Sequence, residues 1–61
     1  MDNKPLLTTK EAASFLGLSA HTLRQNRSTG KLKIPFVRFG HAVRYRMEDL
    51  QAFIVQNLVS Q

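Results

Sequence analysis

Several absences narrow what this chain can be. It has no cysteine, which excludes disulfides and thiolate zinc ligands, and His21 and His41 alone cannot build a structural zinc site. Its apolar runs are far shorter than the roughly 20 residues that span a bilayer, and no signal peptide is visible. A chain of 61 residues also lacks material for the walls of a catalytic cleft. We therefore expect one soluble, intracellular, non-enzymatic domain over residues 1–61, with residues 1–5 flexible.

The middle of the chain lacks acidic residues. Residues 20–46 contain no Asp or Glu, whereas residues 1–19 are neutral overall and residues 47–61 carry a charge of −2. The net charge of +5 therefore belongs to one continuous segment, and charge confined in this way is typical of a surface that binds a polyanion. The segment holds seven of the nine basic residues, namely Arg24, Arg27, Lys31, Lys33, Arg38, Arg44 and Arg46.

Two helices are expected in the first half of the chain. Thr8–Glu11 fits a capping box, and the helix that follows should end at Gly17, which can adopt the left-handed conformation. A second helix is expected over Ala20–Ser28, with Gly30 as its stop. Since only Leu18-Ser19 separates Gly17 from the second helix, the two helices must turn sharply against each other. This layout is a helix-turn-helix.

After Gly30 the spacing of the apolar residues changes from a helical pattern to a strand pattern. Residues 36–46 predict a β-hairpin with a short loop at residues 40–42, and residues 47–58 predict an amphipathic C-terminal helix that opens with two acidic residues. The expected order is helix, helix, two-stranded hairpin, helix. The fold class is therefore α+β, a small winged helix-turn-helix.

The expected register of the hairpin places like charges opposite each other. Pairing Phe39 with Val43 puts Tyr45 on the inner face, and Arg38 then faces Arg44 outside. Such a pair costs roughly 0.2–1 kcal/mol unless an anion lies between the two side chains. We therefore expect the hairpin to grip DNA phosphates, through Arg38, His41, Arg44 and Arg46. The simpler alternative is that these arginines only keep the protein soluble.

The second helix offers side chains suited to reading bases. Its N-terminal part would enter the major groove, where Gln pairs with adenine, Arg with guanine, and Thr with a phosphate or a thymine methyl group. The candidates are His21, Thr22, Arg24, Gln25 and Arg27, with Lys31 and Lys33 in the connector. Two have simpler alternatives, since Thr22 could only close the cap on Ser19 and His21 could be solvated. No catalytic, metal or cofactor constellation is present in the sequence.

The motifs Leu-Leu-Thr-Thr-Lys-Glu-Ala-Ala, Leu-Gly-Leu-Ser, Val-Arg-Phe-Gly and Val-Arg-Tyr-Arg-Met-Glu-Asp-Leu lie between residues 6 and 50. With these motifs, residues 6–55 resemble the AlpA/excisionase-like winged helix-turn-helix family, which is related to MerR-type DNA-binding domains. The resemblance implies a bacterial, cytoplasmic, nucleoid-associated protein of a phage or other mobile element. It would act as an excisionase, also called a recombination directionality factor, or as a transcriptional regulator. Double-stranded DNA would be its partner, with an integrase or further copies of itself as possible others.

One position departs from the family pattern. Asn26 stands where the family usually has a large apolar residue, and the helical register points it inward beside Leu23. An unpaired buried amide would cost on the order of 1–3 kcal/mol. Either the helix is rotated slightly, or Asn26 bonds a nearby backbone group. The second helix would otherwise be looser than usual.

Two other function classes remain open. A non-specific binder of RNA or of an anionic membrane is disfavoured, because most aromatic residues are expected to face the core and the most amphipathic helix begins with acids. A protein-interaction module is suggested by the apolar end of the last helix, with Ile54, Val55, Leu58 and Val59. No membrane and no small-molecule ligand is expected as a partner.

Overall fold

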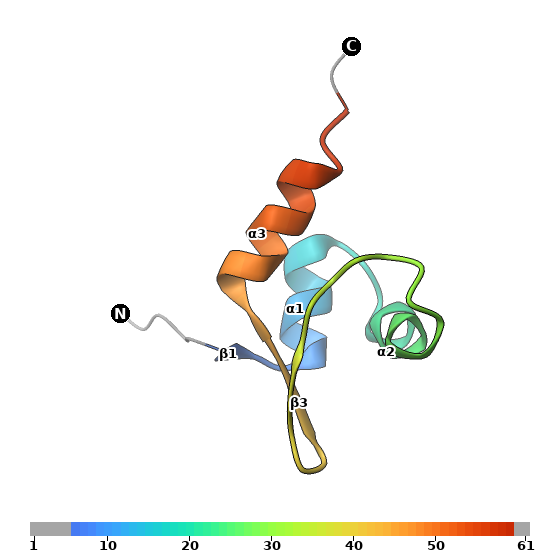
Figure 1. Ribbon diagram of the computed structural model, residues 1–61, viewed down its shortest axis with the longest axis vertical. Coiled ribbons are helices and arrows are strands. Elements are labelled where there is room, and N and C mark those ends of the chain that lie inside the picture. Colours follow the sequence, from blue (N-terminus) through green and yellow to red (C-terminus); the bar gives the residue numbers. More distant parts are fainter. Residues whose placement is uncertain (1–5, 60–61) are drawn as a thin grey trace.

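The protein folds as three helices around a small antiparallel sheet (Figure 1). The computed structural model describes residues 6–59, so the expectation for residues 1–5 lies outside the described residues. The predicted α+β class and the order helix, helix, hairpin, helix are confirmed, an architecture consistent with a small winged helix-turn-helix. The elements are β1 (Leu6–Leu7), α1 (Thr9–Leu16), α2 (Ala20–Thr29), β2 (Val37–Phe39), β3 (Ala42–Arg46) and α3 (Met47–Gln56).

Helix α1 begins and ends where its capping residues predict. The backbone N–H of Thr8 donates to Glu11 Oε1 at 3.0 Å, and the N–H of Glu11 donates to Thr8 Oγ1 at 3.1 Å. At the other end, Gly17 adopts a φ of 75°, and the Leu18 N–H donates to the Ala13 carbonyl at 2.9 Å. This arrangement is a Schellman motif, which satisfies the carbonyls of the last turn and reverses the chain within two residues.

Helix α2 starts at once after this turn. Ser19 is its N-cap, and the Ser19 Oγ accepts from the Thr22 N–H at 3.1 Å. Gly30 ends the helix with a φ of 67°, and its N–H donates to the Asn26 carbonyl at 2.7 Å. In Figure 1, α2 is seen end-on while α1 lies closer to the plane of the view, so the two helices cross steeply. The predicted helix-turn-helix is therefore present.

The sheet has three strands in the order β1-β3-β2, and β3 has a different partner along each half. Its first half pairs with β2, while Tyr45 and Arg46 pair with Leu7 and Leu6 of β1. The sequence did not predict β1, because a pairing of two residues leaves no periodic pattern. The hairpin of β2 and β3 extends away from α3, toward the bottom of Figure 1.

The predicted register of the hairpin is wrong by one residue. Phe39 pairs with Ala42 rather than Val43, and Arg38 pairs with Val43, so Arg38 does not face Arg44. The turn holds two residues instead of three, because Gly40 takes a φ of 58° and a two-residue turn of this kind matches the twist of the strands. A slip of one residue moves every side chain of β2 to the other face. Phe36 thus turns inward, and Phe39 turns outward.

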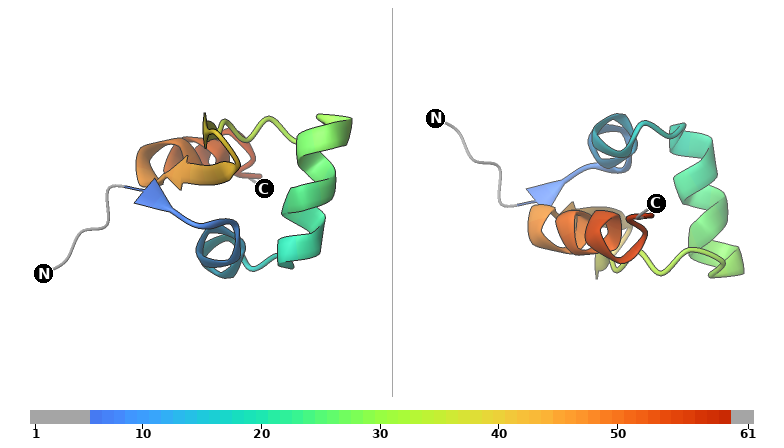
Figure 2. Two further views of the ribbon diagram at one scale, coloured as in Figure 1. Left: turned by 90° about the horizontal axis from the view of Figure 1, so that it is seen from below. Right: turned by 90° about the horizontal axis from the view of Figure 1, so that it is seen from above.

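A compact apolar core holds the elements together. Ala12 and Ala13 on α1 are buried small residues, which allow close packing against neighbouring elements. The largest side chains with almost no exposure are those of Tyr45, Leu23 and Leu50. Helix α3 packs on α1 and on β3 through Leu50. Figure 2 shows α2 at one end of this assembly, clear of α3. The core residues are Leu7, Ala12, Ala13, Leu23, Ile34, Tyr45 and Leu50.

Candidate nucleic-acid interface

One side of α2 is open to solvent along its length. Leu23 and Asn26 face inward, and the four candidates for base reading, His21, Thr22, Arg24 and Gln25, are all exposed. Thr22 also takes part in the helix cap, because its Oγ1 lies 2.8 Å from Ser19 Oγ. The structural role considered for Thr22 is therefore present. Arg24 makes no ion pair within residues 6–59, so its charge is available to a partner.

Arg27 differs from the other α2 candidates because its guanidinium bonds within the protein. Its Nη1 donates to Thr9 Oγ1 on α1 and to the Tyr45 hydroxyl on β3, both at 3.0 Å. The side chain is half-buried. Arg27 thus ties α2 to α1 and to the hairpin, a role that its position in the sequence did not reveal.

Phe36 lies between two arginines from different elements. The guanidinium carbon of Arg27 is 6.0 Å from the Phe36 ring centroid, and that of Arg38 on β2 is 5.6 Å from it. Both distances allow cation–π attraction, which stabilises each cation without neutralising its charge. The ring also packs on Tyr45, with 6.2 Å between centroids. The basic surface of α2 therefore continues into the hairpin through the Phe36 ring.

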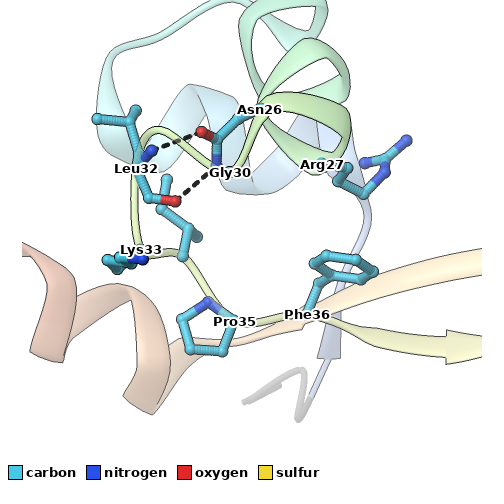
Figure 3. A pocket seen from close by; sticks show the side chains of 8 residues that line it. Asn26, Arg27, Gly30, Leu32, Lys33, Pro35 and Phe36 are labelled. Atoms are coloured by element: carbon cyan, nitrogen blue, oxygen red, sulfur yellow. Dashed lines mark hydrogen bonds between the residues drawn. The ribbon is translucent and has the colours of Figure 1, made fainter.

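Asn26 fixes the connector that joins α2 to β2 (Figure 3). Its side chain is only 8% exposed, its Nδ2 donates to the Leu32 carbonyl at 2.9 Å, and its Oδ1 accepts from the Leu32 N–H at 2.7 Å. The explanation that Asn26 bonds a nearby backbone group is confirmed, and no buried side-chain polar atom among the described residues lacks a partner. The expected looseness of α2 thus has no basis in its hydrogen bonding. The connector residues Lys31 and Lys33 are exposed.

The hairpin presents cations on both faces. Arg38 is exposed on the face that carries Phe36, whereas Arg44 is half-buried on the other face with its Nη1 donating to the Val43 carbonyl at 2.8 Å. His41 is exposed in the turn. Arg38 and Arg44 therefore do not form the directly opposed like-charge pair that the predicted register required. The hairpin still carries the positive charge of both arginines.

Arg46 is engaged by acidic residues at the start of α3. Its Nε donates to Asp49 Oδ2 at 2.7 Å and its Nη2 donates to Asp49 Oδ1 at 2.9 Å, while Glu48 lies 3.4 Å from Nη1. The hydrogen bond from Arg46 lowers the pKa of Asp49, and the same bond with the nearby negative charges raises the pKa of Arg46. This arginine therefore carries less net positive charge to a partner than the others.

The site as a whole presents groups that suit an extended polyanion. Exposed cations and amide or hydroxyl groups lie along α2, the connector and the hairpin, and no group of three His, Cys, Asp or Glu residues able to hold a metal occurs within residues 6–59. No helix in this range is long and apolar enough to cross a membrane. The sequence did not reveal the role of Phe36, which depends on the hairpin register, or that of the Tyr45 hydroxyl, which depends on how β3 lies relative to α2.

Comparison with known families agrees with this geometry. Residues 6–57 match the model of the helix-turn-helix domain family. Since the match covers most of the chain, the protein belongs to this family, which supports DNA binding and DNA as the partner. A search of curated proteins finds no match. Helix-turn-helix domains of this kind are typically non-enzymatic.

Proposed function

We propose that this protein binds double-stranded DNA sequence-specifically, with α2 in the major groove and the β2–β3 hairpin as a wing on the backbone or in the minor groove. The observation that carries the proposal is the continuity of the basic surface. Arg27 and Arg38 approach the same Phe36 ring from α2 and from the hairpin, and no carboxylate occurs in residues 20–46. A ligand that follows this surface must be long and negatively charged, as a DNA duplex is.

The proposal gives the residues separate roles. His21, Thr22, Arg24 and Gln25 would contact base edges or adjacent phosphates, because they are exposed on the helix that enters the groove. Arg27 would hold α2 against the hairpin and add positive potential rather than read a base. Arg46 would contribute least, because Asp49 is its partner. The phosphate contacts would come from Lys31, Lys33, Arg38, His41 and Arg44.

The test is the salt dependence of binding to a duplex. Five cations have no carboxylate partner among residues 6–59 and lie on the proposed surface, namely Arg24, Lys31, Lys33, Arg38 and Arg44. If all five contact phosphates, log K should fall with log salt with a slope of about −4 to −5. The measurement is fluorescence anisotropy on a 20-bp duplex selected from a random library by the wild-type protein. A slope near zero, or equal affinity for selected and random duplexes, would contradict sequence-specific binding.

The biological role we propose is that of an excisionase (recombination directionality factor), an AlpA-like transcriptional regulator, or both, in a bacterial mobile element. The resemblance of residues 6–55 to the AlpA/excisionase-like proteins supports this role. Footprints on the attachment sites of an integrated element, and stimulation of excision by its integrase, would support the first activity. Footprints only upstream of genes, with altered transcript levels, would support the second.

A second candidate function is binding to another protein through the end of α3. Ile54 and Val55 on α3 are 43% and 69% exposed, and Leu58 and Val59, which follow the helix, are 75% and 73% exposed. The partner could be an integrase or a further copy of this chain. The double variant Val55→Ser and Leu58→Ser should preserve folding and single-site DNA affinity but reduce cooperative binding to repeated sites. Unchanged cooperativity would remove this candidate.

A further inference from the structure

We infer that Phe39 is an apolar DNA contact at the end of the hairpin, with its ring packed against the sugars that line the minor groove. The inference rests on the proposed DNA-binding function and deepens it. Phe39 is 54% exposed, the largest exposed fraction among the five aromatic residues, and it does not pack on the core. An aromatic ring in such a position calls for an explanation, because half of its apolar surface remains in water.

The hairpin fixes the backbone of Phe39 at its outer end. Phe39 is the last residue of β2, and it pairs with Ala42 across the two-residue turn of Gly40 and His41. Alanine is small, so the cross-strand partner covers little of the ring. Because the turn is short and hydrogen-bonded strands flank it, the backbone at Phe39 is ordered before a ligand arrives. Little backbone conformational entropy would then be lost on binding.

The positive charge around Phe39 indicates that its ring contacts DNA. Arg44 lies on the same face of the hairpin, Arg38 and His41 are close in sequence, and residues 20–46 contain no acid. The other exposed apolar side chains differ in this respect. Phe15 follows Glu11 on α1, and the exposed residues of α3 follow Glu48 and Asp49. Of these apolar positions only Phe39 belongs to the basic segment, so it is the one that fits a surface of phosphates and sugars.

The chemistry of the minor groove suits this combination. Its walls are the apolar faces of deoxyribose, and its edges are phosphates, so a ring between cations meets both. Apolar side chains that enter this groove are a known means of binding DNA without reading base edges. Arg44 and Arg38 would contact the phosphates on the two sides while the ring displaces water from the sugars. The wing would thus contribute affinity through burial as well as charge.

The decisive experiment compares Phe39→Ala with Phe15→Ala on the duplex selected by the wild-type protein. We expect Phe39→Ala to weaken binding about 5- to 15-fold, because half of a Phe surface is at stake. The slope of log K against log salt should stay that of the wild type, since no charge is removed. Phe15→Ala removes the same side chain at 43% exposure outside the basic segment and should change affinity less than about twofold.

Hydroxyl-radical footprinting locates the contact. The wild type should protect sugars in one minor-groove segment beside the α2 site, and Phe39→Ala should lose that protection. Guanine N7 in the major groove, probed separately by dimethyl sulfate methylation, should stay protected. Phe39→Leu, which retains part of the apolar surface, should lie between the two in affinity. Circular dichroism must show the wild-type fold for each variant.

The results separate this inference from the proposed function. If the wild type shows no salt-dependent duplex binding, the proposed function itself fails. If the wild type binds but Phe39→Ala retains its affinity and its sugar protection, only the role of Phe39 is overturned. An equal loss in Phe15→Ala also overturns it, because the effect would then not be confined to the hairpin. A loss of cooperativity alone in Phe39→Ala would assign the ring to a neighbouring protein copy instead.

Discussion

The Asn26 side chain and the Leu32 backbone exchange two hydrogen bonds, of 2.9 Å and 2.7 Å, across the end of α2. The Asn26 carbonyl also accepts from Gly30, so one residue both ends the helix and fixes the chain that leaves it. A position that the sequence pattern marks as apolar is thus occupied by an amide with satisfied bonds. The connector to the hairpin is held by this amide together with Ile34, which is buried in the core.

Replacing Asn26 should therefore destabilise the protein without any change in charge. We expect Asn26→Ala to lower the free energy of unfolding by about 1–3 kcal/mol, because the Leu32 N–H loses its partner and the Leu32 carbonyl keeps only the bond from the Ile34 N–H. Urea denaturation measures the loss. The control is Gln25→Ala, which is exposed on the same helix and should change stability by less than about 0.5 kcal/mol. Equal stability of the two variants would show that the paired bonds contribute nothing.

Gly17 should tolerate substitution poorly for conformational reasons alone. Its φ is 75°, and a Cβ at this position would meet no atom within 4 Å. We expect Gly17→Ala to lower the free energy of unfolding by about 1–2 kcal/mol, the cost of the left-handed conformation for an L-residue. The chain is short enough for chemical synthesis, and a D-alanine at position 17 should restore or exceed wild-type stability. A loss with both enantiomers would point to a steric cause instead.

Two arginines on α2 should behave in opposite ways. Arg27→Met removes bonds to Thr9 and Tyr45 and should lower the free energy of unfolding by about 1–3 kcal/mol. Arg24→Met should leave stability within about 0.5 kcal/mol of the wild type but weaken duplex binding and reduce the salt slope by about 1. Thermal denaturation and anisotropy measure the two effects.

Tyr45→Phe offers a further check on Arg27. In the Tyr45→Phe background, Arg27→Met should cost less than in the wild type, because one of its bonds is already gone. Additive losses would mean that the Arg27–Tyr45 bond is not energetically coupled.

The Arg46–Asp49 pair should make stability depend on pH in the acidic range. The hydrogen bond from Arg46 holds the pKa of Asp49 below its ordinary value of 3.8, so protons bind more tightly to the unfolded chain. The stabilising contribution is then complete above that ordinary value, and it disappears as the pH falls through the lower folded value. We expect Asp49→Asn to have a lower Tm than the wild type at pH 7.

This difference in Tm should shrink below about pH 4 and in high salt. Glu48→Gln is the matched control, since Glu48 lies 3.4 Å from Arg46 without the paired hydrogen bonds, and its effect should be smaller. A difference that stays constant from pH 7 to pH 2 would show that charge on Asp49 is not its cause.

The elements set by local chemistry could be predicted from the sequence, and the contacts set by pairing could not. The caps at Thr8, Gly17, Ser19 and Gly30 depend on residues within one turn, so their positions agree with the structure. The hairpin register could not be predicted, because residues 36, 37 and 39 are all apolar and either face of β2 could turn inward.

The same distinction holds for the candidate site: properties set by local spacing could be predicted, and contacts between elements could not. Exposure of His21, Thr22, Arg24 and Gln25 follows from helical spacing around Leu23, which the sequence shows. The internal roles of Arg27 and Arg46 depend on which side chains other elements bring beside them. Tyr45 reaches Arg27 only because β3 crosses near the start of α1, a relation between residues 18 positions apart. The local sequence pattern does not show which residues from distant parts of the chain come into contact.

The divided pairing of β3 has a mechanical consequence for the hairpin. Tyr45 and Arg46 pair with Leu7 and Leu6, so β1 fixes the base of the hairpin. The outer end of the hairpin is formed by β2 and the first half of β3 alone. The direction in which the turn points is then set at the amino-terminal strand, at the far end of the sequence from α3. A substitution that weakens the pairing with β1, for example Leu7→Ser, would change the direction of the hairpin although no residue of the turn is altered.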